Sequence, residues 1–204
     1  MYGSCVYMEK VLKNRPVILR IMYIALVVVL AAVDQLTKYL TVEFIKPKGT
    51  IPLIKIGETE WLNFTYCENT GMSFSLLEGQ RLILIAVPLI LIAGVTFLVF
   101  TGKMNSGRTD ICIALAALAG GGLGNLIDRI FNGYVVDFID VRIINFAIFN
   151  FADICAVCGG IYFGVMLAVD EIKEEKAKKA HEASENAAVN TETVPSDGEE
   201  NGQA

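Results

Sequence analysis

The chain has 204 residues, of which 54% are hydrophobic and only 19% charged, and its mean hydropathy is +0.52. These values are typical of a membrane protein with several spans and argue against a soluble domain. The formal charge of −5 arises from acids concentrated near the C-terminus, so the composition does not indicate a nucleic-acid partner.

Four apolar segments are long enough to cross a membrane, which takes about 20 residues. Basic residues precede the first segment, but no small-x-small cleavage site of a signal peptide follows it. We therefore predict a retained span and not a cleaved leader. Pro16 is expected in the first turn of the first helix, where its missing N–H costs nothing. The predicted spans cover residues 17–40, 82–100, 111–130 and 147–169.

The connection after the first span, residues 41–80, alternates apolar and polar residues and carries Trp61, Phe64 and Tyr66. This pattern predicts short strands that form a small sheet on the outer membrane surface. We therefore predict an all-α polytopic membrane protein with four transmembrane helices and a small extracytoplasmic β-sheet between helices one and two. Residues 1–170 would be the membrane domain, and residues 171–204 an acidic tail that begins helical and ends disordered.

Basic residues near the ends of the spans predict the orientation. They are concentrated before the first span, in the loop between the second and third spans, and after the fourth. Both termini are therefore expected on the cytoplasmic side. In this topology the unusual polar residues meet at the outer boundary of the membrane, with Asp137 in the short connection between the third and fourth spans and the others in the spans: Asp34, Lys38, Asn125, Asp128, Arg129, Asn150 and Asp153.

Such a concentration of ionisable residues in an apolar chain indicates a functional site, because buried charge in a membrane is costly. The only histidine, His181, lies in the tail, which argues against serine-protease and HExxH zinc chemistry. The C-x-x-C at Cys155 and Cys158 is better explained by packing than by redox or zinc chemistry. Two neighbouring carboxylates that share a proton can instead act as general base and general acid, as in aspartic proteases.

Five motifs occur in order along the chain, and together they resemble the bacterial lipoprotein signal peptidases, or signal peptidase II, over about residues 18–169. The motifs are D-Q-L-T-K at 34–38, N-T-G-M-S-F at 69–74, G-G-x-G-N-x-x-D-R at 121–129, V-V-D-F at 135–138 and F-N-x-A-D at 149–153.

The resemblance implies a multi-pass intramembrane aspartic endopeptidase of the bacterial inner membrane that needs no metal or organic cofactor. We expect it to be monomeric. It would cleave diacylglyceryl-modified prolipoproteins on the amino side of the lipidated cysteine, with the acyl chains remaining in membrane lipid. The implied catalytic pair is Asp137 and Asp153. The implied substrate-binding or supporting residues are Asp34, Lys38, Asn69, Gly71, Asn125, Asp128, Arg129 and Asn150.

Alternative interpretations remain for single residues and for the whole chain. Asp128 is the rival of Asp137 for the catalytic role, although an ion pair with Arg129 would make it structural. Asp140 is interpreted as a solvated loop charge. The glycines at 120–124 suggest helix packing in preference to a phosphate loop, since no P-loop lysine follows. For the whole chain, a small proton-coupled transporter is the alternative function, because paired membrane carboxylates also relay protons.

Overall fold

The computed structural model describes residues 2–71, 79–101, 108–144 and 146–192. In these ranges four helices are long and apolar enough to span a membrane, which confirms the predicted architecture. They are α1 (Tyr2–Leu40), α2 (Arg81–Thr101), α3 (Thr109–Phe131) and α4 (Phe151–Glu192). Residues 72–74 of the N-T-G-M-S-F motif and 193–204 of the predicted tail lie outside the described residues.

Two predicted helix starts were wrong. Helix α1 begins at Tyr2, so Pro16 lies inside it and not in its first turn. Helix α4 begins at Phe151, four residues later than predicted, because Phe149 is paired with Ile139 by backbone hydrogen bonds and Asn150 then caps the helix. Apolar composition alone does not distinguish the bridged residues before Asn150 from the helix that follows.

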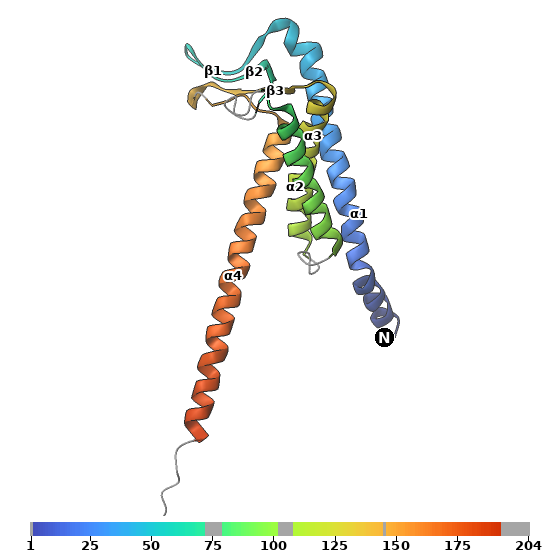
Figure 1. The fold of residues 1–204 in the computed structure, drawn as a ribbon, viewed down its shortest axis with the longest axis vertical. Helices are drawn as coiled ribbons and strands as arrows, with labels where there is room; N and C mark the ends of the chain where they lie inside the picture. Colours follow the sequence, from blue (N-terminus) through green and yellow to red (C-terminus); the bar gives the residue numbers. More distant parts are fainter. Residues whose placement is uncertain (1, 72–78, 102–107, 145, 193–204) are drawn as a thin grey trace, which may run out of the picture. The chain divides into compact units, whose positions relative to one another are not determined.

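The sheet has three antiparallel strands in the order β1 (Thr50–Ile56), β2 (Thr59–Asn69) and β3 (Val135–Val141). The first two strands form a hairpin that turns at Gly57, whose φ is +62°. The third strand comes from the connection between α3 and α4, so the prediction of a sheet confined to the first connection was incomplete. Figure 1 shows the sheet beside the C-terminal end of α3 and the first turn of α4.

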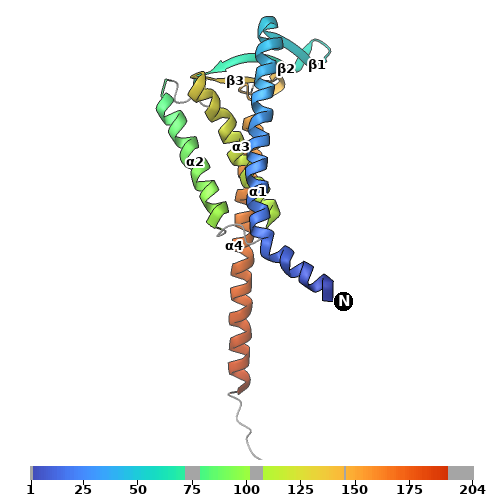
Figure 2. The same ribbon diagram turned by 90° about the vertical axis from the view of Figure 1, so that its right-hand side faces the viewer.

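Helix α3 is the central helix of residues 1–163, packing between α1 and α2 (Figure 2). Its glycines permit close contact, as predicted: a Cβ on Gly120 would lie 3.0 Å from Leu30 Cβ, and one on Gly124 would lie 2.5 Å from Asp34 Oδ2. The contacts divide the chain into two compact units, residues 1–163 and 164–204. The predicted domain boundary at residue 170 stays a prediction.

Candidate active site

A cavity of about 270 Å³ lies at the sheet end of α3 and receives side chains from five elements. Its polar lining brings together residues that are far apart in the sequence. The apolar part of its wall includes Val87 and Leu91 of α2 and Leu118 of α3. The polar lining residues are Asn69, Asn125, Arg129, Asp137 and Asp153.

Asp137 lies on β3, opposite Cys67 of β2, next to an irregularity in the β2–β3 pairing. The residue is 2% exposed, and its carboxylate accepts two amide hydrogen bonds, from Asn150 Nδ2 at 2.6 Å and Asn69 Nδ2 at 2.9 Å. Removal from water disfavours the charged form, and burial raises the pKa of Asp137 to about 6 although both amides oppose the shift. This side chain is therefore suited to carry a proton near neutral pH.

Asp153 lies in the first turn of α4, where it completes a reciprocal cap. Its Oδ2 accepts the backbone N–H of Asn150 at 3.1 Å, and Asn150 Oδ1 accepts the backbone N–H of Asp153 at 3.0 Å. This is the capping-box arrangement, which satisfies two free N–H groups at a helix start. The other carboxylate oxygen accepts Asn125 Nδ2 at 2.7 Å. Both oxygens of the Asp153 carboxylate therefore accept N–H groups at the start of a helix.

Two side-chain amides join the carboxylates. Asn150 Nδ2 donates to Asp137 and also to Asn125 Oδ1, at 3.1 Å, while Asn125 Nδ2 donates to Asp153. The hydrogen bonds determine which way each amide faces, because each oxygen accepts from an N–H group that cannot accept in return. The two acids are thus held by one continuous network.

Lys38 lies behind this network, 3% exposed. Its ammonium forms ion pairs with Asp34 Oδ2 at 2.7 Å and Asp128 Oδ2 at 3.0 Å, and it donates to Asn125 Oδ1 at 2.9 Å. Asp34 and Lys38, four residues apart on α1, are therefore in contact, and Lys38 also pairs with a second acid on α3.

Arg129 and Gly71 meet at the edge of the cavity. Arg129 Nη2 donates to the Gly71 carbonyl at 3.0 Å, and the Gly71 N–H donates to Asn69 Oδ1 at 3.0 Å. This chain of contacts orients the Asn69 amide toward Asp137. Arg129 Nε is buried without a hydrogen-bond partner among the described residues. It is therefore a free N–H donor on a residue that lines the cavity.

The two rival aspartates do not line the cavity. Asp128 forms its ion pair with Lys38 and not with the neighbouring Arg129, so the proposed pairing partner was wrong. Asp140 is 7% exposed, accepts Thr65 Oγ1 at 2.8 Å and pairs with Arg142 at 2.8 Å, so its interpretation as a solvated loop charge was also wrong. The unpredicted strand β3 explains this burial, because it places Asp140 in the sheet.

Gln35 is a residue next to the candidate site that the sequence analysis did not single out. Its Nε2 donates to the Gly124 carbonyl at 3.0 Å and to Asp128 Oδ1 at 3.2 Å. The available signal was its place inside the D-Q-L-T-K motif, although neither partner is near it in sequence.

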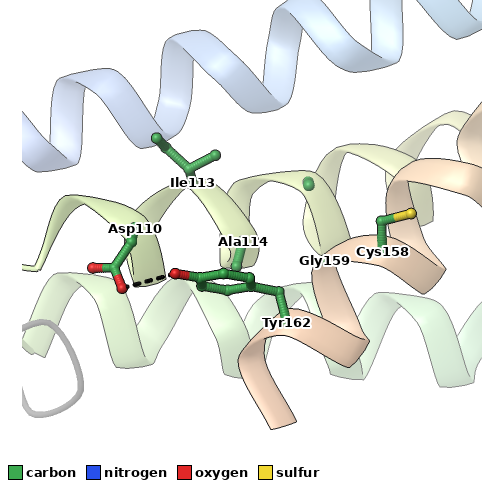
Figure 3. Close-up of a pocket in the computed structure, with 7 residues that line it drawn as sticks. Asp110, Ile113, Ala114, Cys158, Gly159 and Tyr162 are labelled. Atoms are coloured by element: carbon green, nitrogen blue, oxygen red, sulfur yellow. Dashed lines mark hydrogen bonds between the residues drawn. The ribbon is translucent and has the colours of Figure 1, made fainter. Parts of the chain in front are cut away.

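A second hollow of about 340 Å³ lies between α3 and α4, nearer the N-terminal end of α3 (Figure 3). Its lining includes a single carboxylate, that of Asp110. Asp110 Oδ2 already accepts hydrogen bonds from the Tyr162 hydroxyl at 3.0 Å and from Arg108 Nη2 at 2.7 Å. This hollow therefore lacks the paired acids of the first cavity. In the part of the chain that the structure describes, no group of three or more His, Cys, Asp or Glu residues is arranged to hold a metal ion.

Comparison with known proteins identifies the family. Residues 26–169 match the family model described as signal peptidase (SPase) II. The chain belongs to this family. The lipoprotein signal peptidase of Caldanaerobacter subterraneus subsp. tengcongensis is 36% identical over 146 residues, covering 72% of this chain and 95% of the relative. That of Halalkalibacterium halodurans is 37% identical over 162 residues, covering 78% and 97%.

Two solved structures of bacterial membrane enzymes have a similar fold. A bacterial membrane enzyme solved at 2.3 Å resolution has a TM-score of 0.62 and 28% identity, covering 74% of this chain and 89% of that one. Another, solved at 1.9 Å, has a TM-score of 0.59 and 29% identity, covering 72% and 92%. The chain is therefore a multi-pass bacterial membrane protein and an aspartic peptidase of the signal peptidase II family. Membership supports the main functional prediction and not the transporter alternative.

Proposed function

We propose that this peptidase removes signal peptides from diacylglyceryl-modified prolipoproteins, cleaving on the amino side of the lipidated cysteine, with Asp137 and Asp153 as its catalytic pair. The observation that carries the assignment is that these two carboxylates, from β3 and α4, line one cavity and are joined through Asn150. The names of the relatives support the class of substrate.

Differences between the surroundings of the two carboxylates support a separate proposed role for each. Asp153 accepts N–H groups at a helix start and acts as the base that takes a proton from water. Buried Asp137 carries the proton and gives it to the carbonyl oxygen as the water oxygen bonds to the carbonyl carbon. The resulting tetrahedral diol then collapses: Asp153 gives the proton it took from water to the cysteine nitrogen as the C–N bond breaks, and one diol hydroxyl gives its proton to Asp137. A carboxylic acid and a free amine leave, and both carboxyl groups return to their starting protonation states.

Other residues would hold the substrate in place. Arg129 Nε and the Asn69 amide lie at the cavity and are proposed to hydrogen-bond the substrate backbone, with Gly71 fixing both. The apolar wall from α2 suits the apolar part of a signal peptide, while the acyl chains remain in membrane lipid. The remaining supporting residues are proposed to brace the site: Asp34, Lys38, Asn125, Asp128 and Asn150.

The proposed orientation places both termini in the cytoplasm and the cavity at the outer face of the inner membrane. The support is the distribution of Lys and Arg near the span ends. The enzyme is proposed to act as a monomer without a cofactor, since a pair of carboxylates and water are sufficient for the chemistry. The acidic tail beyond residue 170 would take no part in it.

Lipid-dependent cleavage tests this proposal. Detergent-purified protein is incubated with a diacylglyceryl-modified prolipoprotein and with the same prolipoprotein lacking the lipid, and the products are identified by mass spectrometry. We expect cleavage only of the modified substrate, directly before the lipidated cysteine. Equal cleavage of both substrates, or cleavage at another bond, would contradict the substrate assignment.

The pH dependence follows from the burial of Asp137. Because its pKa is raised to about 6, its proton is present below that pH and is lost as the pH rises through it, so kcat/KM should fall on the alkaline side of this value. Bound substrate excludes water, so the corresponding fall in kcat should lie at higher pH.

Asn69→Ala removes a hydrogen-bond donor that favours the charged form of Asp137. This variant should therefore lose kcat/KM at a higher pH than the wild type. If the alkaline fall in kcat/KM of Asn69→Ala lay at lower pH than that of the wild type, the role of Asp137 as the acid would be contradicted.

A further inference from the structure

The C-terminal end of α3 carries Arg129 and lies beside the cavity. The last carbonyl groups of a helix have no partner within the helix and need a donor from elsewhere. The N–H groups of Asn132 and Gly133 both donate to the Asp128 carbonyl, at 2.7 and 3.2 Å. The next two carbonyls, of Arg129 and Ile130, accept instead from a side chain of another helix.

That side chain is Arg81, the first residue of α2. Its Nε donates to the Arg129 carbonyl at 3.1 Å, and its Nη2 donates to the Ile130 carbonyl at 2.9 Å. The guanidinium also lies over the turn that leads from α3 to β3, because a Cβ on Gly133 would be 3.8 Å from Arg81 Cζ. A planar fork of N–H groups can hold two neighbouring carbonyls at once. Arg81 therefore caps the end of α3 from α2.

Arg129 is held from two sides by residues that are ten positions apart in the sequence. Its carbonyl accepts from Arg81, and its Nη2 donates to the Gly71 carbonyl at 3.0 Å. The Gly71 N–H then donates to Asn69 Oδ1 at 3.0 Å. Consecutive contacts thus connect Arg81 to both side chains that are proposed to hydrogen-bond the substrate backbone. Arg81 itself does not line the cavity.

We infer that Arg81 is a positioning residue that sets where Arg129 meets the substrate backbone. The inference rests on the proposed function, in which the free Nε of Arg129 binds substrate. Without Arg81 two carbonyls at the end of α3 lose their donor, and an uncapped helix end opens readily. Substrate affinity then falls, while the catalytic carboxylates keep their hydrogen bonds from Asn150 and Asn125.

Arg20 offers a matched control at the other end of α2. Its Nη2 donates to the Phe100 carbonyl at 2.8 Å, in the last turn of that helix. Arg20 thus donates to a carbonyl at a helix end, as Arg81 does, but it does so at the end of α2 opposite to Arg81. A residue whose only role is to cap a helix would give the same result at both places.

The test compares Arg81→Met, Arg81→Lys and Arg20→Met with the wild type. Methionine removes the donors, whereas lysine keeps the charge without the fork. Each variant is assayed for kcat and KM on the lipid-modified prolipoprotein and for thermal unfolding in detergent. Binding is measured separately as the Kd of the same prolipoprotein for Asp153→Asn, which should bind without cleaving. This Kd is measured for Asp153→Asn alone and with Arg81→Met, Arg129→Met or both added.

We expect Arg81→Met to raise KM about 10-fold at unchanged kcat, as the loss of one hydrogen bond from a charged group to the substrate would. Arg81→Lys should give an intermediate KM, and Arg20→Met should match the wild type in both constants. In the Asp153→Asn background, Arg81→Met and Arg129→Met should each raise Kd about 10-fold or more. The double addition should raise Kd no further than Arg129→Met does, because Arg81 acts through Arg129.

Four outcomes would overturn the inference: equal kinetics of Arg81→Met and Arg20→Met, a fall in kcat at unchanged KM, additive losses of affinity in the double addition, or failure of both Arg81 variants to fold. The proposed function fails separately. If the wild type does not cleave the lipid-modified prolipoprotein, the substrate assignment is wrong whatever the Arg81 variants do. If the wild type cleaves but Arg129→Met leaves Kd unchanged, the substrate role of Arg129 is wrong, and the inference falls with it.

Discussion

Asp153→Asn should abolish peptide cleavage, lowering kcat by about 10³-fold or more, while the protein still inserts and folds. An amide cannot take a proton from water, so the base is lost, and general acid–base groups contribute up to about 10⁴-fold in rate. The fold should survive because an Asn oxygen can still accept the Asn150 N–H that caps α4. The measurement is initial rate on the lipid-modified substrate, together with thermal unfolding in detergent.

Asp137→Asn should have an effect of the same size, because it removes the proton donor. Asp140→Asn is the matched control: Asp140 is also a buried aspartate of β3, but it pairs with Arg142 outside the cavity. We expect it to retain most of the activity. If Asp140→Asn were inactive while Asp137→Asn remained active, the assignment of the catalytic pair would be wrong.

Gly121→Ala is the second substitution with a large expected effect, since it should impair catalysis and stability together. A Cβ at this position would overlap the Ala152 carbonyl oxygen and would lie 2.8 Å from the Ala156 backbone nitrogen. Both atoms belong to the main chain of α4, which cannot yield as a flexible side chain can. The overpacking should cost about 1–3 kcal/mol. The forced shift of the first turn of α4 would displace Asp153 and cost about 100-fold in kcat.

Gly160→Ala provides the control for this prediction. It adds the same methyl group to α4, but the nearest heavy atom to its Cβ is Leu118 Cδ1, at 3.8 Å. We expect wild-type kcat and unfolding temperature. Equal losses of kcat and stability in the two variants would show that replacing a helical glycine by alanine causes the effect by itself, and not the contact of the new Cβ at position 121.

Several features could be predicted from the sequence because their signals are local. Four apolar segments predict four spans, and motifs in order predict which polar side chains converge. The i,i+4 spacing of Asp34 and Lys38 predicts their contact. Asn150 and Asp153 are three residues apart, a spacing that puts them on one helix face but does not indicate that they form the cap that starts α4.

Other features depended on contacts between distant segments. The V-V-D-F-I-D-V segment is rich in β-branched residues, yet its strand character requires the edge of β2 to pair with it. The burial of Asp140 follows from that pairing, and so it was missed. The partner of Asp128 was also missed, because Lys38 is adjacent to it only when α1 packs against α3.

The composition of the sheet has a consequence for biosynthesis. Two strands are supplied by the chain before α2, whereas the third strand, with Asp137, and the helix with Asp153 are made last. A ribosome-bound chain that has inserted three spans therefore holds neither the finished sheet nor the second carboxylate. With Asp137 and Asp153 as the proposed catalytic pair, we expect hydrolysis only after the final span has entered the bilayer, so that partly inserted intermediates would not cut neighbouring nascent proteins.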